Sequence, residues 1–184
     1  FALSFPSAVS KWGWFPLAFV SVAPVFVVVH RAAWGRVFLY GIFYGLLSYT
    51  LFNLWLIAWH PIAVFVVPGV YAIYFLILLP VLKLLDTAWP RYGYLLQFLG
   101  WIGYEYAKTL GFLGYPYGIL GYTQYLVLPL IQISDLTGVW GVSALVVFPS
   151  VYLGNAAKEG FEGVRDFFRK HRVSPVVYGV LLVA

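Results

Sequence analysis

The sequence predicts an all-α integral membrane protein, built as a polytopic helix bundle. Hydrophobic residues make up 63% of its 184 residues and charged residues only 9%, whereas roughly 25% of the residues of an average soluble domain are charged. Several uncharged stretches approach or exceed the roughly 20 residues that a helix needs to cross a bilayer. The basic residues gather in alternate connections between these stretches. Together these three features indicate a bundle of membrane-spanning helices.

Five complete spans are expected, with partial spans at both ends of the chain. The complete spans are residues 12–29, 37–58, 62–82, 92–109 and 136–157, and the partial spans are residues 1–5 and 173–184. The fourth span is long enough only if Glu105 and Lys108 sit near one membrane surface. Gly41 and Gly45 in the second span have the G-x-x-x-G spacing that permits close contact between helices. Because both ends resemble cut helices, we expect the sequence to be an excerpt of a longer polypeptide.

The basic residues predict which side of the membrane each connection faces. Of eleven Lys and Arg residues, nine lie between the first two spans, between the third and fourth, and after the fifth. By the positive-inside rule, residues 30–36, 83–91 and 158–172 are cytoplasmic and residues 110–135 face outward. Residues 158–172 also read as an amphipathic helix on the cytoplasmic leaflet. The net charge of +5 therefore reflects topology, and no nucleic-acid partner is expected.

Several kinds of chemistry find no support in these residues. The sequence contains no cysteine, so it offers neither a thiolate nucleophile nor a disulfide. His30, His60 and His171 lack a metal-ligand spacing, and we expect neither a metal nor a cofactor. No nucleophile elbow, phosphate loop or paired-carboxylate signature occurs. We therefore assign direct catalysis to no residue of this chain.

The outward-facing segment 110–135 has an unusual composition. It is too apolar for a solvated loop and too rich in Gly and Pro for an ordinary membrane helix, so surrounding protein must hold its backbone at membrane depth. We expect a re-entrant or interfacial segment here. Long irregular segments within a compact fold are often functional. The alternative is a plain belt of tyrosines at the membrane interface.

A polar stripe leads toward this segment from the fourth span. Gln97, Trp101, Glu105 and Lys108 are spaced by four, four and three residues and share one helix face. A buried carboxylate needs a partner, and Lys108 is the nearest candidate for Glu105. A local ion pair is the structural alternative to a role in substrate binding or domain docking. The residues expected at this outward site are Glu105, Lys108, Tyr115, Pro116, Tyr117, Tyr122, Gln124, Asn53 and Trp55, although a hydrogen bond between helices explains Asn53 equally well.

Five elements in a fixed order carry a resemblance to a known family. They are Glu105-Tyr106-Ala107-Lys108, Gly114-Tyr115-Pro116-Tyr117, Leu120-Gly121-Tyr122-Thr123-Gln124, Pro129-Leu130-Ile131-Gln132-Ile133-Ser134-Asp135 and Gly138-Val139-Trp140-Gly141. This series resembles the membrane part of bacterial apolipoprotein N-acyltransferases. The family typically shows Glu-x-x-Arg, Gly-Phe-Pro-Trp, Gly-Tyr-Ser-Gln and Gly-Val-x-Gly in this order. The sequence departs from that pattern at Lys108, Tyr117 and Thr123, which stand in place of Arg, Trp and Ser.

The resemblance implies a function, a location and a missing domain. The implied reaction moves an acyl chain from a phospholipid to the N-terminal diacylglyceryl-cysteine of a lipoprotein, the last step of lipoprotein maturation. Its partners are the phospholipid donor and the lipoprotein acceptor, and its location is the bacterial cytoplasmic (inner) membrane. The nitrilase-like catalytic domain of the family, with its Glu-Lys-Cys set, is expected beyond residue 184. Within residues 1–184, the resemblance implies walls and docking surfaces.

Two other functional classes fit the same residues. One is a multi-span transporter that binds a solute at the broken segment 110–129, but the sequence shows no second Gly/Pro-broken element of the kind that a repeated half would supply. The other is a non-catalytic membrane scaffold that acts with a separate catalytic subunit. Whether the reading frame continues beyond residue 184 into a catalytic domain, or stops there, distinguishes the enzyme from the scaffold.

Overall fold

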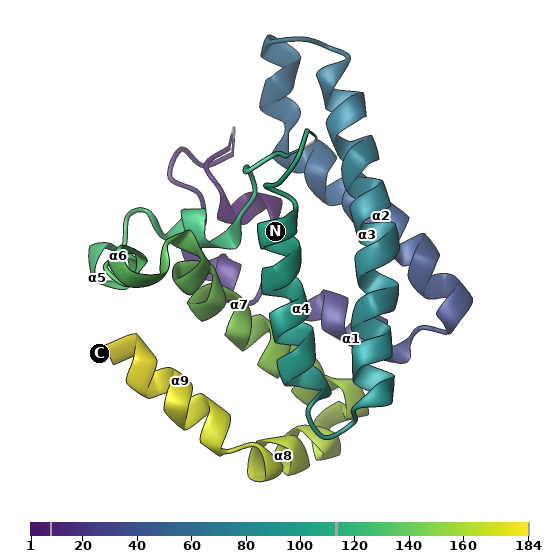
Figure 1. Ribbon diagram of the computed structural model, residues 1–184, viewed down its shortest axis with the longest axis vertical. Coiled ribbons are helices and arrows are strands. Elements are labelled where there is room, and N and C mark those ends of the chain that lie inside the picture. Colours follow the sequence, from purple (N-terminus) through teal and green to yellow (C-terminus); the bar gives the residue numbers. More distant parts are fainter. Residues whose placement is uncertain (8, 113, 184) are drawn as a thin grey trace.

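The computed structural model describes residues 1–7, 9–112 and 114–183 (Figure 1). Within them every regular element is a helix, which confirms the predicted all-α class. The elements are η1 Ala2–Ser4, η2 Phe15–Phe19, α1 Ala23–Arg31, α2 Trp34–Phe52, η3 Leu54–Ala58, α3 Ala63–Ala88, α4 Gly93–Ala107, η4 Leu120–Gln124, α5 Leu128–Ile131, α6 Ser134–Thr137, α7 Val139–Ala156, η5 Ala157–Glu159, α8 Gly160–Lys170 and α9 Val173–Val183. The predicted segments 110–135 and 173–184 each include one residue, 113 and 184 respectively, that lies outside this description.

Two of the described helices, α3 and α7, are long and apolar enough to cross a membrane. The other predicted spans correspond to shorter or divided elements. The predicted span 12–29 is divided into η2 and α1, which are joined by a turn. Pro16 and Pro24 lie in the first turns of these two helices, where the missing backbone N–H of proline costs nothing. The second predicted span stops at Asn53, and η3 continues the chain from Leu54.

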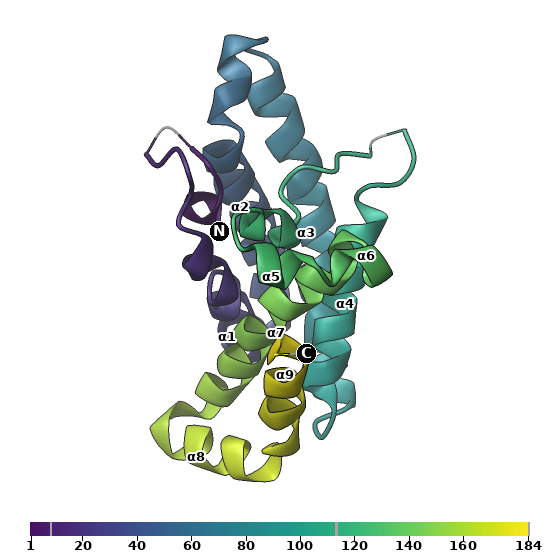
Figure 2. The same cartoon turned by 90° about the vertical axis from the view of Figure 1, so that its left-hand side faces the viewer.

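Helices α2 and α3 form a long antiparallel pair that lies side by side in both views (Figures 1 and 2). Gly41 and Gly45 allow this approach. A Cβ on Gly45 would lie 2.6 Å from the carbonyl oxygen of Tyr71, and one on Gly41 would collide with the carbonyl oxygen of Phe75. The close helix contact predicted from the G-x-x-x-G spacing is therefore confirmed.

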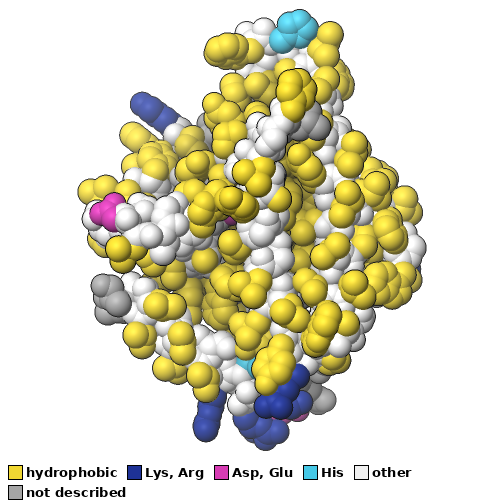
Figure 3. Space-filling model, viewed as in Figure 1, with side chains coloured by type: hydrophobic (Ala, Val, Ile, Leu, Met, Phe, Trp, Pro, Cys, Tyr) yellow, Lys and Arg dark blue, Asp and Glu magenta, His cyan; other side chains and the backbone are white. Residues whose placement is uncertain are grey.

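Helix α7 lies at the centre of the bundle, against α1, α4 and η4. The core between the helices is aromatic: the Trp101 ring lies 5.8 Å from that of Phe26 and 6.1 Å from that of Phe75. The outer surface is also apolar, since Phe43 on α2 and Phe65 on α3 are 66% and 78% exposed. Figure 3 shows hydrophobic side chains over most of one face, with most of the visible Lys and Arg side chains at its lower end.

Candidate functional site

The buried carboxylate of Glu105 lies near the end of α4 and is held by three donors. The hydroxyl of Ser143 on α7 donates to one of its oxygens. The other oxygen accepts from the backbone N–H of Leu120 at 3.1 Å and from the indole N–H of Trp101 at 3.4 Å. Glu105 is only 1% exposed. The carboxylate therefore ties three segments together: α4, α7 and the start of η4.

Lys108 does not pair with Glu105, although it lies one turn further along. Its ammonium donates to the hydroxyl of Tyr49 at 3.0 Å and to the carbonyl oxygens of Tyr117 at 3.2 Å and Gly118 at 2.8 Å. Among the described residues, ion pairs form only at Asp86 and Asp166. The structural alternative, a local ion pair between Glu105 and Lys108, is therefore not supported by the described contacts. Lys108 is the residue at which α4 ends, so its side chain can leave the helix direction and reach the segment that folds back.

Three tyrosine rings enclose the ammonium of Lys108. Its nitrogen lies 5.5 to 5.7 Å from the ring centroids of Tyr104, Tyr49 and Tyr71, a distance at which the ring faces attract a cation. The rings of Tyr49 and Tyr71 stack at 3.4 Å. Lys108 is only 1% exposed, and its ammonium contacts oxygens and rings of the chain itself.

Asn53 and Tyr115 connect this network to the end of α2. The Asn53 amide donates to the carbonyl oxygen of Tyr49 at 2.8 Å, and the Tyr115 hydroxyl donates to the Asn53 side-chain oxygen at 2.6 Å. Burial raises the pKa of Tyr115 to about 12, with a smaller contribution from Tyr117. Tyr115 therefore keeps its proton and remains a donor at neutral pH.

Two glycines let the outward segment pack against the bundle. Gly118 has φ +73°, a left-handed conformation that side chains rarely adopt. A Cβ on Gly121 would lie 2.8 Å from the carbonyl oxygen of Val139 and 2.9 Å from the backbone nitrogen of Ser143. Only glycine allows η4 to approach α7 this closely.

An aromatic cavity of about 320 Å³ opens beside the network. It is lined by Phe5, Pro6, Phe52, Trp55, Tyr117, Gly118, Tyr122 and Tyr125. The rings of Trp55 and Tyr117 are 5.9 Å apart, and about half of each side chain is exposed. Such rings combine an apolar body with a polar tip, so the cavity suits a ligand with both apolar and polar parts.

The structure brings most of the predicted site residues together, in two neighbouring groups. Asn53, Lys108 and Tyr115 join through Tyr49, while Trp55, Tyr117 and Tyr122 line the cavity. Pro116 is exposed. Gln124 is buried but lies apart, where its amide donates to the carbonyl oxygen of Phe15 at 3.1 Å.

The network also contains residues that sequence reasoning missed: Tyr49, Tyr71, Tyr104 and Ser143. A signal existed for Tyr49, because it precedes Asn53 by one helical turn and therefore shares its face. Ser143 was visible as a polar residue within the apolar stretch 136–157. Neither pattern indicates which buried group the hydroxyl contacts.

Comparisons with known proteins point to one family. Residues 1–152 match the family described as "Apolipoprotein N-acyltransferase N-terminal domain". This chain belongs to the apolipoprotein N-acyltransferase family. It is 36% identical over 180 residues to Apolipoprotein N-acyltransferase 1 of Treponema denticola, covering 97% of this chain and 33% of that protein. It is 46% identical over 147 residues to Apolipoprotein N-acyltransferase 1 of Treponema pallidum, covering 80% of this chain and 27% of that protein.

A third relative extends the likeness beyond the treponemes. Apolipoprotein N-acyltransferase of Geobacter metallireducens is 36% identical over 173 residues, covering 86% of this chain and 32% of that protein. The chain thus spans about a third of the length of the relatives it matches. No solved structure matches it.

In this member of the N-acyltransferase family, the elements that carried the sequence resemblance meet at one end of the bundle. Glu105 and Lys108 lie at the end of α4, Gly121 is in η4, and Gly138 precedes α7. Lys108 stands where the family typically has Arg. Its three N–H groups match the three oxygens around it. The substitution therefore leaves every acceptor in this pocket satisfied.

Proposed function

We propose that this chain is the membrane-embedded part of an apolipoprotein N-acyltransferase. The proposed reaction transfers an acyl chain from a phospholipid to the N-terminal amine of a diacylglyceryl-cysteine on a lipoprotein. The names of the relatives support this activity. Acyl transfer in two steps needs an activated nucleophile beside a base, and we place that nucleophile in a nitrilase-like domain outside residues 1–184.

The proposal includes five membrane crossings, with residues 110–135 on the outer side of the bacterial inner membrane. Two features support this placement. Large apolar side chains such as Phe43 and Phe65 face outward from α2 and α3, as lipid contact requires. In addition, most of the Lys and Arg side chains visible in Figure 3 gather at its lower end, as expected of a cytoplasmic surface.

The buried pair of anchors at Glu105 and Lys108 carries the proposed role of the site. Glu105 accepts from the backbone of Leu120, and Lys108 donates to the backbone of Tyr117 and Gly118. These contacts fix the segment that forms one wall of the aromatic cavity. A charged side chain within a membrane costs about 2.5 to 3.5 kcal/mol on insertion scales, so two buried charges indicate a demand beyond packing. We assign them to positioning the wall that receives lipid or docks the catalytic domain.

The test measures N-acylation of a model lipopeptide by the full-length natural protein. We expect Glu105→Ala to lower kcat/KM by about tenfold or more, which corresponds to about 1.4 kcal/mol of lost transition-state stabilisation. Arg165→Ala changes an exposed charge on α8 and should leave the rate unchanged. If both variants acylate at the parent rate, the outward site is misassigned.

A second variant covers the case in which Glu105→Ala fails to fold. Tyr122→Ala removes a half-exposed ring from the cavity wall and leaves the buried network intact. We expect it to raise the KM for phospholipid while the unfolding midpoint stays within error. An unchanged KM would show that the cavity does not take part in binding the phospholipid.

A further inference from the structure

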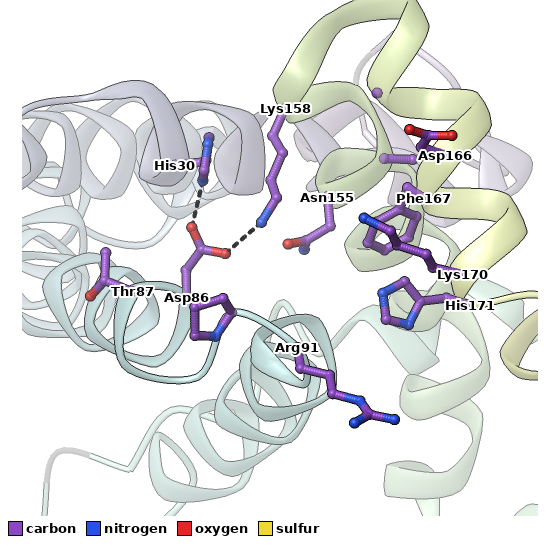
Figure 4. A pocket seen from close by; sticks show the side chains of 13 residues that line it. His30, Asp86, Thr87, Arg91, Asn155, Lys158, Asp166, Phe167, Lys170 and His171 are labelled. Atoms are coloured by element: carbon purple, nitrogen blue, oxygen red, sulfur yellow. Dashed lines mark hydrogen bonds and ion pairs between the residues drawn. The ribbon is translucent and has the colours of Figure 1, made fainter.

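A second cavity, of about 710 Å³, lies at the other end of the bundle, far from the site described above. Its walls come from the end of α1, the turn between α3 and α4, the end of α7 and the helix α8 (Figure 4). The predicted topology puts this end in the cytoplasm. The acyl-transfer proposal makes no use of this cavity.

The acidic side chains that line this cavity are already paired. Asp86 lies between His30, whose Nδ1 is 2.6 Å from one carboxylate oxygen, and Lys158, whose Nζ is 2.9 Å from the other (Figure 4). Asp86 is only 5% exposed. Asp166 pairs with Arg169 at 3.3 Å. The described carboxylates that line this cavity therefore already pair with cations of the chain itself.

Basic groups are left over on the same walls. Arg91, Lys170 and His171 line the cavity, and none of them makes an ion pair with a described acidic side chain. The ring of His171 packs 4.7 Å from those of Tyr94 and Phe167. Burial lowers the pKa of His171, and the charges of Lys170, Lys158 and Arg91 lower it further. Arg91 and Lys170 thus line the same cavity without an ion-pair partner among the described acidic side chains.

An apolar groove of about 280 Å³ lies near this cavity, since Val173 and Ser174 line it and closely follow His171 in the chain. It runs between α4, α7 and α9 and is lined by residues that include Leu95, Phe148, Val173 and Tyr178. Tyr94 lies between the two spaces: its ring packs on His171, which lines the cavity, and its hydroxyl lies 2.7 Å from that of Ser174, which lines the groove. The basic cavity and the apolar groove therefore lie on either side of Tyr94, on the same flank of the bundle.

The geometry points to a binding site for an anionic glycerophospholipid of the cytoplasmic leaflet. Its phosphate lies in the basic cavity beside Arg91 and Lys170, and one acyl chain follows the groove along α9. Basic pockets between helices on the cytoplasmic side suit such head groups. A free phosphate ion would use the same basic residues, but it would leave the adjoining groove without a role. The bound lipid holds α8 and α9 against α4 and α7.

The test measures retention of phosphatidylglycerol by the full-length natural protein, using native mass spectrometry over a lipid titration. Arg91→Gln/Lys170→Gln removes two charges from the cavity. The matched control, Arg36→Gln/Arg165→Gln, removes two exposed charges from the same predicted side that do not line it. At the energy typical of a basic residue near an anionic lipid, the cavity variant should bind about thirtyfold more weakly. The control should bind like the parent.

Equal weakening by both double variants would overturn the site, because it would indicate general attraction to a basic surface. If the cavity variant unfolds, Lys170→Gln alone carries the test, with an expected loss of about fivefold. Retention of phosphatidylcholine as strong as that of phosphatidylglycerol would also contradict the proposal.

Two further arms separate a lipid from free phosphate. Excess inorganic phosphate should fail to displace bound phosphatidylglycerol, and displacement would show that the ligand is the phosphate ion. Ala144→Phe fills the groove and should weaken retention of the lipid while the unfolding midpoint is maintained. Unchanged retention in this variant would show that no acyl chain occupies the groove.

Discussion

The ammonium of Lys108 lies 2.8 Å from the carbonyl oxygen of Gly118, ten residues further along the chain. This contact turns the chain back from the end of α4 toward the bundle. The backbone N–H of Tyr115 reinforces the turn by donating to the Lys108 carbonyl oxygen at 2.9 Å. One buried cation therefore fixes the outward segment from both its side chain and its backbone.

Replacing Lys108 should loosen this segment and destabilise the protein. Lys108→Met keeps a long apolar side chain but leaves the carbonyl oxygens of Tyr117 and Gly118 without their donor. Because an unsatisfied buried polar group costs about 1 to 3 kcal/mol, we expect a loss of at least about 2 kcal/mol in the free energy of unfolding. Denaturant unfolding in detergent micelles measures it. Lys11→Met, at an exposed position, is the control, and equal midpoints for the two variants would contradict the anchoring role.

A methyl group at Gly121 should push η4 away from α7. The added Cβ would meet the backbone of Val139 and Ser143 at less than 3 Å, and overpacking of this kind typically costs about 1 to 3 kcal/mol. Gly103→Ala is the matched control, because nothing lies within 4 Å of that position and alanine favours a helix. The midpoint temperature of thermal unfolding should fall for Gly121→Ala and should stay the same or rise for Gly103→Ala. The opposite order would mean that η4 does not pack on α7.

The hydroxyl of Tyr115 should matter for stability up to strongly alkaline pH. Tyr115→Phe leaves the Asn53 side-chain oxygen without its donor, and we expect a cost of about 1 kcal/mol. Because the folded pKa is raised from 10.0 to about 12, the unfolded chain loses its proton first. Stability is therefore full below pH 10 and falls as the pH rises toward about 12. Unfolding measured from pH 7 to 12 should show that the difference in the free energy of unfolding between parent and variant narrows only above pH 10. A difference that narrows near pH 8 would argue against the hydrogen bond between Tyr115 and Asn53.

His171 should make the docking of α8 and α9 sensitive to acid. Its pKa is lowered from 6.5, mainly by burial, so the unfolded chain binds a proton more readily than the folded one. The stability that neutral His171 contributes to the folded state is present above pH 6.5 and is lost as the pH falls. Hydrogen exchange of residues 164–182, corrected for intrinsic rates, should show weaker protection at pH 5.5 than at pH 7.5.

A matched pair of histidine variants isolates this effect. His171→Phe keeps a ring against Tyr94 and Phe167 and should abolish the pH dependence. His60→Phe changes an exposed histidine at the opposite end of α3 and should preserve it. The same pH dependence in both variants would assign the effect to another group.

The sequence by itself determined the helical class, the ability of α2 to contact another helix closely and the shared face of Gln97, Trp101, Glu105 and Lys108. Each follows from composition or from spacing within one helix, so it needs no knowledge of what lies opposite. The same local reasoning could offer only Lys108 as a candidate partner for Glu105, because spacing reveals only neighbours one turn away.

The tertiary structure alone decided the real partners of these two charges. Ser143 lies 38 residues after Glu105 and Tyr49 lies 59 residues before Lys108, and no pattern along the chain connects them. A buried polar group takes whichever partner the packed helices bring within about 3 Å. Only the folding of η4 against α7 and the meeting of α2 with α4 fix those partners.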